Sequence, residues 1–266
     1  MGWVAVLVAL LISGAMALAW RVALTTGQSG RIDAIWAFAT GLAAVIAAAG
    51  SHGDPSRRAL VWLMAAAWSL RLGLALWRRA ANGGDDPRYA ALKQSWGSAA
   101  PRRLFVFLQI QAIASWPLAL TAWSAAGAPR PGPDGRDGLA IALFALAFAG
   151  EAIADRQMAR FRRAPANRGR ICDQGLWALS RHPNYFFEWL VWLAYPVMAI
   201  CANYPAGWLA LLGPLVIYAL LVDVSGVPPL EAHLSRSRPE EFAAYAEKVS
   251  AFWPRPPRRS RRSAKP

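Results

Sequence analysis

The segment from Gly175 to Glu188, GLWALSRHPNYFFE, carries the densest set of side chains that could do chemistry. It places two basic side chains, Arg181 and His182, beside an amide, Asn184, and a carboxylate, Glu188, at the start of an apolar stretch. Ionisable groups are costly inside lipid, so such a cluster at the edge of an apolar segment indicates a functional site. This segment is the first candidate for binding or catalysis.

The local pattern also predicts what this segment could hold. Pro183 suits the first turn of a helix, because proline lacks the amide hydrogen that would be unpaired there. The free amides of that helix start, with Arg181 and His182 beside them, favour an anion such as a phosphate. Asn184 and Glu188 are four residues apart and therefore share one helical face. An amide beside a carboxylate could recognise a carboxamide or a ribose hydroxyl.

The composition predicts the elements that must position these residues. The chain has 266 residues, of which 56% are hydrophobic and only 17% charged, with 14 Trp and a mean hydropathy of +0.27. These values lie outside the usual soluble range and predict an all-α integral membrane protein. A bilayer span needs about 17 to 25 residues. Seven windows meet this length and are expected to be transmembrane helices: 3–20, 32–50, 60–77, 104–126, 139–154, 185–202 and 205–226.

The domain organisation and topology follow from the same windows. We expect one seven-helix domain over residues 1–254 and a basic Pro/Arg tail over 255–266. The first window lacks a basic leading region and runs into Arg21, so we expect a retained helix and not a cleaved signal peptide. If the helices alternate, one face receives 24 of the 29 Lys and Arg. The positive-inside rule then places the N-terminus outside and the C-terminus in the cytoplasm.

The charge distribution bears on possible partners. The net charge of +14 lies mainly in loops next to the expected spans and in the tail, PRPPRRSRRSAKP. This placement favours anionic lipid and topology setting over nucleic acid. The two cysteines, Cys172 and Cys201, are expected on opposite sides of the membrane, so no disulfide is predicted. His182 and His233 are too far apart for a helical metal pair, and no metal site is predicted.

Five ionisable residues fall near one end of the expected spans, namely Asp33, Arg71, Glu151, Glu188 and Asp223. Arg71 could reach the interface by snorkelling, and Asp33 and Asp223 could simply be solvated at helix ends. Glu188 fits this explanation less well, because a short carboxylate cannot reach far. The sequence therefore leaves both interpretations open and favours a function for Glu188.

Longer motifs then point to a family. From residue 162 to residue 254 the chain resembles the bacterial membrane proteins related to steroid 5α-reductases, and more distantly the sterol reductases and isoprenylcysteine methyltransferases. The resemblance rests on GLWALSRHPNYFFEWLVWLAY at 175–195, GVPPLEAHL at 226–234 and YAEKVSAFWP at 245–254. Weaker likeness extends over Asp33 with Trp36, WSLR at 68–71 and DPRY at 86–89. The pattern of Glu188 four residues after Asn184, with Trp189 following, resembles the reductase branch of this superfamily.

The resemblance implies a seven-helix bundle that binds NADPH from the cytoplasmic face and takes a flat apolar enone, such as a steroid, from the membrane. It assigns Asn184 and Glu188 to the nicotinamide half of the cofactor. It assigns the ribose and phosphates to Asp155, Arg160 and Arg162, with Arg170, Arg181 and His182 as further phosphate neighbours. Arginines suit the 2′-phosphate that distinguishes NADPH from NADH.

The implied activity is an NADPH-dependent oxidoreductase that reduces the C=C bond of a 3-oxo-Δ4 steroid or similar enone. Hydride goes to the β-carbon while a donor stabilises the carbonyl oxygen. The family's oxygen-holding tyrosine falls on Trp68 here, and its early glutamate has no counterpart in the first two helices. Trp68 can donate a hydrogen bond but cannot act as an acid. Asp33, Tyr89 and Tyr185 are the substitutes, and the sequence does not rank them.

Other functions stay open. A membrane methyltransferase that uses S-adenosylmethionine would share the RHP motif and a late glutamate resembling Glu231, although seven basic residues between 155 and 184 exceed what that cofactor needs. A lipid- or sterol-binding protein without turnover would leave Asn184 and Glu188 without a use. Transport is disfavoured, because the polar residues gather at one face. The Ala-, Arg- and Pro-rich composition favours a bacterial inner membrane.

Overall fold

The computed structural model describes residues 2–82 and 85–258, and this part of the chain consists of helices joined by loops, with no strand. It forms two compact units. Unit 1 comprises Met1–Ala140 and Tyr195–Val216, and unit 2 comprises Ile141–Ala194 and Ile217–Pro266. Residues 259–266, most of the predicted basic tail, lie outside the described residues. The region 1–254, expected as a single domain, is thus divided between these two units.

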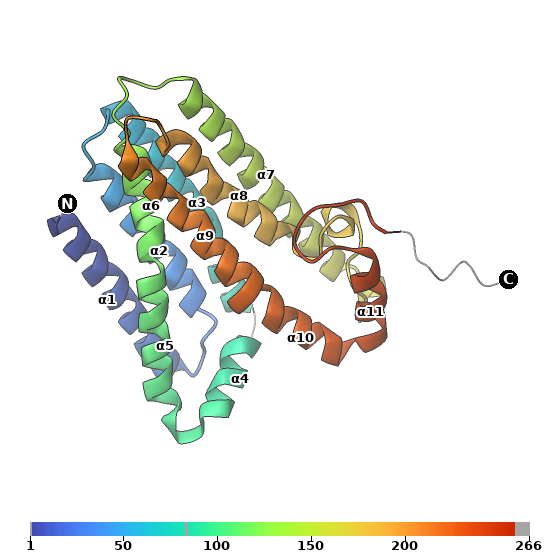
Figure 1. Ribbon diagram of the computed structural model, residues 1–266. Helices are drawn as coiled ribbons and strands as arrows, with labels where there is room; N and C mark the ends of the chain where they lie inside the picture. The colour runs from blue at the N-terminus through green and yellow to red at the C-terminus, as the bar shows by residue number, and fades with distance from the viewer. Residues whose placement is uncertain (1, 83–84, 259–266) are drawn as a thin grey trace. The chain divides into compact units, whose positions relative to one another are not determined.

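Unit 1 is built around α2. Its elements are α1 (Gly2–Thr26), α2 (Ile32–Ala49), α3 (Pro55–Asn82), α4 (Pro87–Trp96), the short 3₁₀ helix η1 (Gly97–Ala99), α5 (Ala100–Ala114), α6 (Trp116–Ala126) and η4 (Pro205–Leu211). Helix α2 packs against α1, α3 and α6, and Figure 1 shows it beside α1 and α3. A Cβ on Gly41 would lie 2.0 Å from the Cβ of Ser69, so the glycine allows α2 and α3 to approach closely. The Ser69 hydroxyl uses this proximity to donate to the Ala37 carbonyl at 3.0 Å.

The expected helix over 104–126 is interrupted in the structure. Helix α5 ends at Ala114 and α6 begins at Trp116, with Pro117 in its first turn. Proline removes an amide donor and clashes with the preceding turn, which explains the interruption. The Ser115 hydroxyl at the junction donates to the Gln111 carbonyl at 2.9 Å and accepts from the Trp36 indole at 2.8 Å. The expected span at 104–126 therefore lies within one long apolar helical stretch, 88–126, that is interrupted at Ser115.

Unit 2 contains the whole of the Gly175–Glu188 segment. Helix α7 (Gly135–Arg163) begins in unit 1 and continues into unit 2, and helix α8 (Pro183–Ala199) begins in unit 2 and ends in unit 1. The loop between them holds η2 (Pro165–Asn167) and η3 (Gly175–Ala178). Helix α9 (Leu212–Tyr218) begins in unit 1 and ends in unit 2. It leads into a π-helical segment η5 (Ala219–Val224), followed by α10 (Val227–Ser237) and α11 (Pro239–Lys248). A Cβ on Gly150 would lie 2.4 Å from the Phe187 ring, so this glycine lets α8 pack closely on α7.

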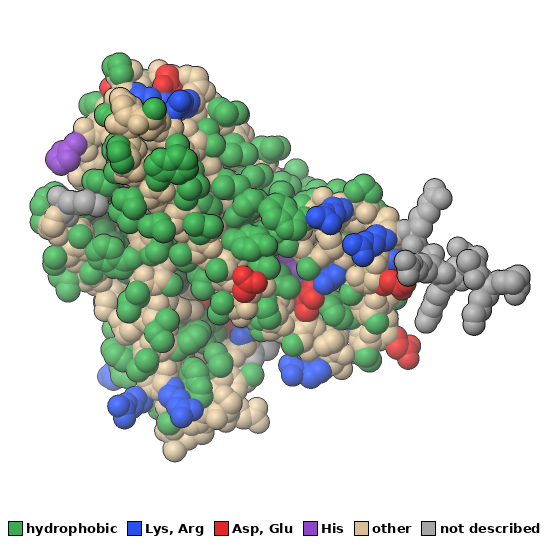
Figure 2. Space-filling model, in the orientation of Figure 1, with side chains coloured by type: hydrophobic (Ala, Val, Ile, Leu, Met, Phe, Trp, Pro, Cys, Tyr) green, Lys and Arg blue, Asp and Glu red, His purple; other side chains and the backbone are tan. Residues whose placement is uncertain are grey.

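The membrane class is supported by length and composition. Six helical stretches in the described residues are long and apolar enough to cross a membrane, at 2–26, 32–49, 55–81, 88–126, 135–163 and 205–237. Figure 2 shows hydrophobic side chains over much of the surface in view. The remaining expected span corresponds to α8, which has 17 residues, the lower limit for a crossing helix. The window at 205–226 is a succession of 3₁₀, α and π segments, which the sequence did not predict.

Candidate functional site

The start of α8 is fixed by the loop that precedes it. Pro183 opens α8, as the sequence predicted. Before it, Gly175 adopts a left-handed φ of +61°, which favours glycine. The Leu176 amide donates to the Gln157 side chain of α7 at 3.0 Å, and the Trp177 indole donates to the Ala154 carbonyl at 3.0 Å. These contacts hold the Arg181–His182 segment within unit 2 by attachment to α7.

Arg181 and His182 converge on Glu231 of α10. The Arg181 guanidinium donates through Nε to Glu231 Oε1 at 2.8 Å and through Nη2 to Oε2 at 3.0 Å, a bidentate pair. His182 Nε2 lies 3.0 Å from the same Oε1. The His182 ring is almost fully buried and stacks on Tyr185, with 5.3 Å between ring centroids. One carboxylate thus organises both basic residues of the RHP motif.

The C-terminal segment of unit 2 secures the same motif through backbone groups. Arg181 Nη1 donates to the carbonyl of Val249 at 2.6 Å, and the Arg181 amide donates to the carbonyl of Ser250 at 2.9 Å. The Tyr245 hydroxyl donates to the Trp177 carbonyl at 2.6 Å, and burial raises the pKa of that phenol. Arg181 therefore directs its donors to protein acceptors, which makes positioning its main role in this structure.

Asn184 and Glu188 lie in the first two turns of α8, as expected. Glu188 is 6% exposed, and the Trp192 indole one turn later donates to its Oε1 at 3.4 Å. Asn184 is half-buried. A carboxylate buried to this extent in an apolar helix is costly unless a function or a partner maintains it. The pair is the strongest candidate for cofactor contact in unit 2.

The remaining cofactor candidates lie at the end of α7 and in the loop that follows. Asp155 is half-buried, whereas Arg160, Arg162 and Arg170 are exposed. Basic residues in the last turn of a helix also interact favourably with its dipole, which gives Arg160 and Arg162 a structural use. The structure places all eight proposed cofactor residues in unit 2.

The catalytic candidates of unit 1 separate into two groups. The Tyr89 hydroxyl, buried in α4, donates to Asp33 Oδ1 of α2 at 2.7 Å, and Asp33 is also paired with Arg88. Gln111 Nε2 lies 3.5 Å from the same hydroxyl. Trp68 of α3 is fully buried and contacts the edge of Trp36, with 6.3 Å between centroids. The DPRY motif was the only sequence signal for the Asp33–Tyr89 pair.

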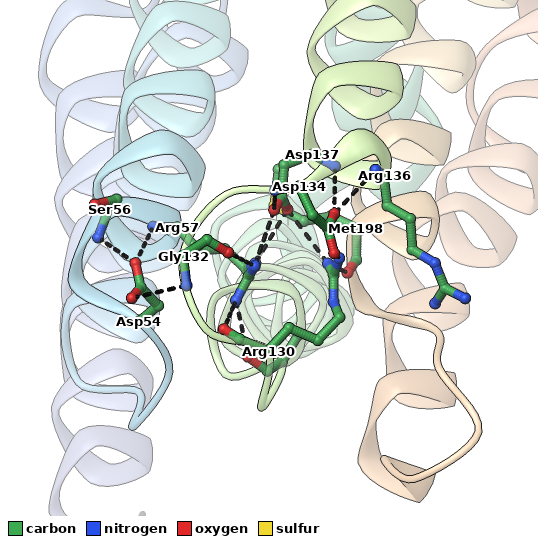
Figure 3. A network of polar contacts seen from close by, with 10 residues as sticks. Asp54, Ser56, Arg57, Arg130, Gly132, Asp134, Arg136, Asp137 and Met198 are labelled. Atoms are coloured by element: carbon green, nitrogen blue, oxygen red, sulfur yellow. Dashed lines mark hydrogen bonds and ion pairs between the residues drawn. The ribbon is translucent and has the colours of Figure 1, made fainter.

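A second ionic network in unit 1 was missed by the sequence analysis, which treated its arginines as loop charges. Figure 3 shows the Arg57 guanidinium of α3 surrounded by the 128–137 segment. Its Nη2 lies 2.9 Å from Asp137 Oδ2, and the two side chains are 0% and 1% exposed. Other Arg57 donors reach the carbonyls of Ala128, Arg130 and Gly132. No sequence motif links these positions.

Arg130 extends this network toward solvent. Its guanidinium pairs with Asp134 and lies 3.3 Å from Asp137. The hydrogen bond from Arg130 lowers the pKa of Asp134 to about 2. Asp134 in turn accepts from the amides of Arg136 and Asp137, which begins α7. The network thus fixes the entry to α7 and has the form of a structural site.

Comparison with known proteins supplies a family. The model of the family described as "Protein of unknown function (DUF1295)" matches residues 19–249, which include α2–α6, the RHP motif, Glu231 and Tyr245. No curated protein and no solved structure matches the chain. The matched region covers most of both units, and the chain therefore belongs to the DUF1295 family.

Proposed function

We propose that the protein is a membrane NADPH-dependent reductase that reduces the C=C bond of an apolar enone, with a 3-oxo-Δ4 steroid as the model substrate. The observation that carries the proposal is the Asn184–Glu188 pair on one face of α8, with Glu188 only 6% exposed. The sequence resemblance to the steroid 5α-reductase group supports the same activity. We further propose seven spans in a bacterial inner membrane, with the cofactor site on the cytoplasmic side.

The residues of unit 2 are suited to this cofactor. The amide of Asn184 and the carboxylate of Glu188 would hold the carboxamide and hydroxyl groups of the nicotinamide half. Asp155 would accept from ribose hydroxyls, and the exposed Arg160, Arg162 and Arg170 would neutralise the phosphates. NADPH, when bound, supplies the hydride. His182 and Arg181, which Glu231 engages, would keep the α8 start in position.

The carbonyl oxygen of the substrate needs a hydrogen-bond donor, and the candidates in unit 1, taken by itself, are Tyr89 with Asp33, and Trp68. The Tyr89 and Asp33 side chains are in direct contact at 2.7 Å. The single hydroxyl proton of Tyr89 points to Asp33, so this bond must break before the proton can serve a substrate oxygen. Trp68 is fully buried and remains a candidate donor through its indole nitrogen only.

Two variants test the proposal. We expect Glu188→Gln and Asn184→Ala to lower kcat/KM for NADPH-dependent enone reduction roughly a hundredfold, which corresponds to about 2.7 kcal/mol. Both proteins should remain folded in detergent, because neither change opens a large cavity. Glu240→Gln, at an exposed glutamate of α11, is the matched control and should retain activity. Near-full activity of the Glu188 variant would refute the proposed role of this carboxylate.

One observation favours a second candidate, a methyltransferase that uses S-adenosylmethionine. The late glutamate that this function requires, Glu231, is in contact with the RHP motif at 2.8 Å and 3.0 Å. The same contacts also explain Glu231 as a positioning residue, without any cofactor. Reductase activity therefore remains the preferred proposal, and ligand binding separates the two.

A further inference from the structure

An apolar groove lies on unit 2, and none of the proposed cofactor residues lines it. It has a volume of about 480 Å³ and is lined by Leu179, Phe186, Leu190, Leu193 and Trp253, among other apolar residues. Phe186 and Leu190 lie about 160° around the α8 axis from Glu188, at 100° per residue. The groove and the Asn184–Glu188 pair therefore use opposite faces of the same helix, and the reductase proposal does not account for the groove.

A polar hollow lies along the chain segment that completes this groove. It has a volume of about 280 Å³, and its charged lining residues are Arg181, Glu247, Lys248 and Arg258. The Arg258 amide donates to the Lys248 carbonyl at 2.9 Å, which closes residues 248–258 into a loop. Trp253 and Pro254 of this loop line the groove, and Val249 to Ala251 line the hollow. One loop therefore borders both an apolar and a charged depression.

The charges of the hollow favour a singly charged anion. Glu231 compensates Arg181 through the bidentate pair. The exposed Lys248 and Arg258 then face one carboxylate, Glu247, which leaves one net positive charge. Exposed Arg255 adds another at the same loop. Figure 2 shows both Lys or Arg and Asp or Glu side chains on the part of unit 2 where Figure 1 draws α11 and the loop that follows it.

We infer that this region is a binding site for one anionic phospholipid. An acyl chain would occupy the groove, where it contacts Phe186, Leu190 and Trp253, and the phosphodiester would lie at Lys248 and Arg258. The bilayer is the source of the ligand, because the chain carries six stretches able to cross it. Tryptophan at such a position suits the boundary between acyl chains and headgroups. The inference does not depend on the proposed reductase activity.

Native mass spectrometry of the full-length protein, purified in detergent, tests this inference. Phosphatidylglycerol and phosphatidylcholine with identical acyl chains are the two probes. We expect wild-type protein to retain one phosphatidylglycerol in preference to phosphatidylcholine. The groove-filling Leu193→Trp should lose most of the bound lipid. The control Leu146→Trp, at an α7 side chain that is 62% exposed and does not line the groove, should retain it.

A charge variant tests the headgroup site separately. Lys248→Gln with Arg258→Gln changes two exposed side chains and leaves the groove intact. Each basic residue near an anionic lipid contributes about fivefold in affinity, so we expect about a twenty-five-fold loss for phosphatidylglycerol and little change for phosphatidylcholine. Equal retention of both lipids by wild-type protein would overturn the inference. The inference would also be overturned if the charge variant, or a folded Leu193→Trp protein, retained as much phosphatidylglycerol as wild-type protein. The tail charges alone would then explain binding.

Discussion

Two ionic networks, one in each unit, are built from an arginine and a carboxylate but differ in how far they are buried. In unit 1, Arg57 and Asp137 are 0% and 1% exposed, and carbonyls of residues 128–132 accept the other Arg57 donors. In unit 2, Arg181 and Glu231 are 13% and 20% exposed, and their carboxylate also engages His182. The Arg57–Asp137 pair at the centre of the first network is closed to solvent, whereas the Arg181–Glu231 pair stays partly accessible next to the start of α8. Burial of a charge in this apolar chain therefore does not by itself mark a functional site.

The largest effect should come from breaking the closed network. Asp137→Ala leaves the Arg57 guanidinium buried without its carboxylate, and such a loss costs about 3–5 kcal/mol. We expect a large fall in melting temperature in detergent, or loss of folded protein. Asp173→Ala, at an exposed carboxylate, is the control and should change stability by less than about 0.5 kcal/mol. An Asp137→Ala protein as stable as the control would show that the network is not structural.

A smaller loss of stability should follow in the accessible network. Glu231→Gln removes the charge that Arg181 and His182 share, and charged hydrogen bonds contribute about 1.5–3 kcal/mol each in buried settings. Partial exposure should reduce the total to about 1–2 kcal/mol. We also expect weaker NADPH binding, because the RHP motif positions the α8 start. A variant with lower stability but unchanged NADPH affinity would leave Glu231 a purely structural residue.

The smallest effect concerns the exposed end of the unit 1 network. Arg130 holds the pKa of Asp134 at about 2, below its usual value of 3.8. A carboxylate with a lowered pKa stabilises the folded protein above pH 4, and this contribution disappears as the pH falls through 2. We expect wild-type protein to melt slightly above Asp134→Asn at pH 5, with the difference vanishing near pH 2. A difference that does not vary with pH would contradict the lowered pKa.

Much of the fold was predictable because it follows from length and hydropathy. The window at 32–50 matches α2 to within one residue, and the window at 139–154 lies inside α7. The interruption at Ser115 was also readable in principle, since Pro117 was visible in the sequence. The π segment at Ala219–Val224 was not, because hydropathy does not distinguish π-helical from α-helical turns. Hydropathy also did not predict the exact length of the helix at 185–202, which the structure gives as the 17-residue α8.

The candidate site was predictable only where residues are neighbours in sequence. Pro183, Asn184 and Glu188 share α8, as their spacing indicated. The partner of the RHP motif, Glu231, lies 50 positions from Arg181, and only the family resemblance singled it out. Asp33 and Tyr89 are 56 positions apart, and helix packing brings them together. Arg57 and Asp137 are 80 positions apart and belong to no motif, so nothing in the sequence pairs them.

The central claim is that unit 2 binds NADPH, and thermal stabilisation of the detergent-purified protein tests it most directly. A ligand that binds only the folded state raises stability by about 2.7 kcal/mol at a hundredfold excess over its Kd. We expect NADPH to raise the melting temperature of wild-type protein and to do so much less for Glu188→Gln and Asn184→Ala, whereas S-adenosylmethionine has no effect. Stabilisation by S-adenosylmethionine alone would contradict the account and assign the chain to methyl transfer.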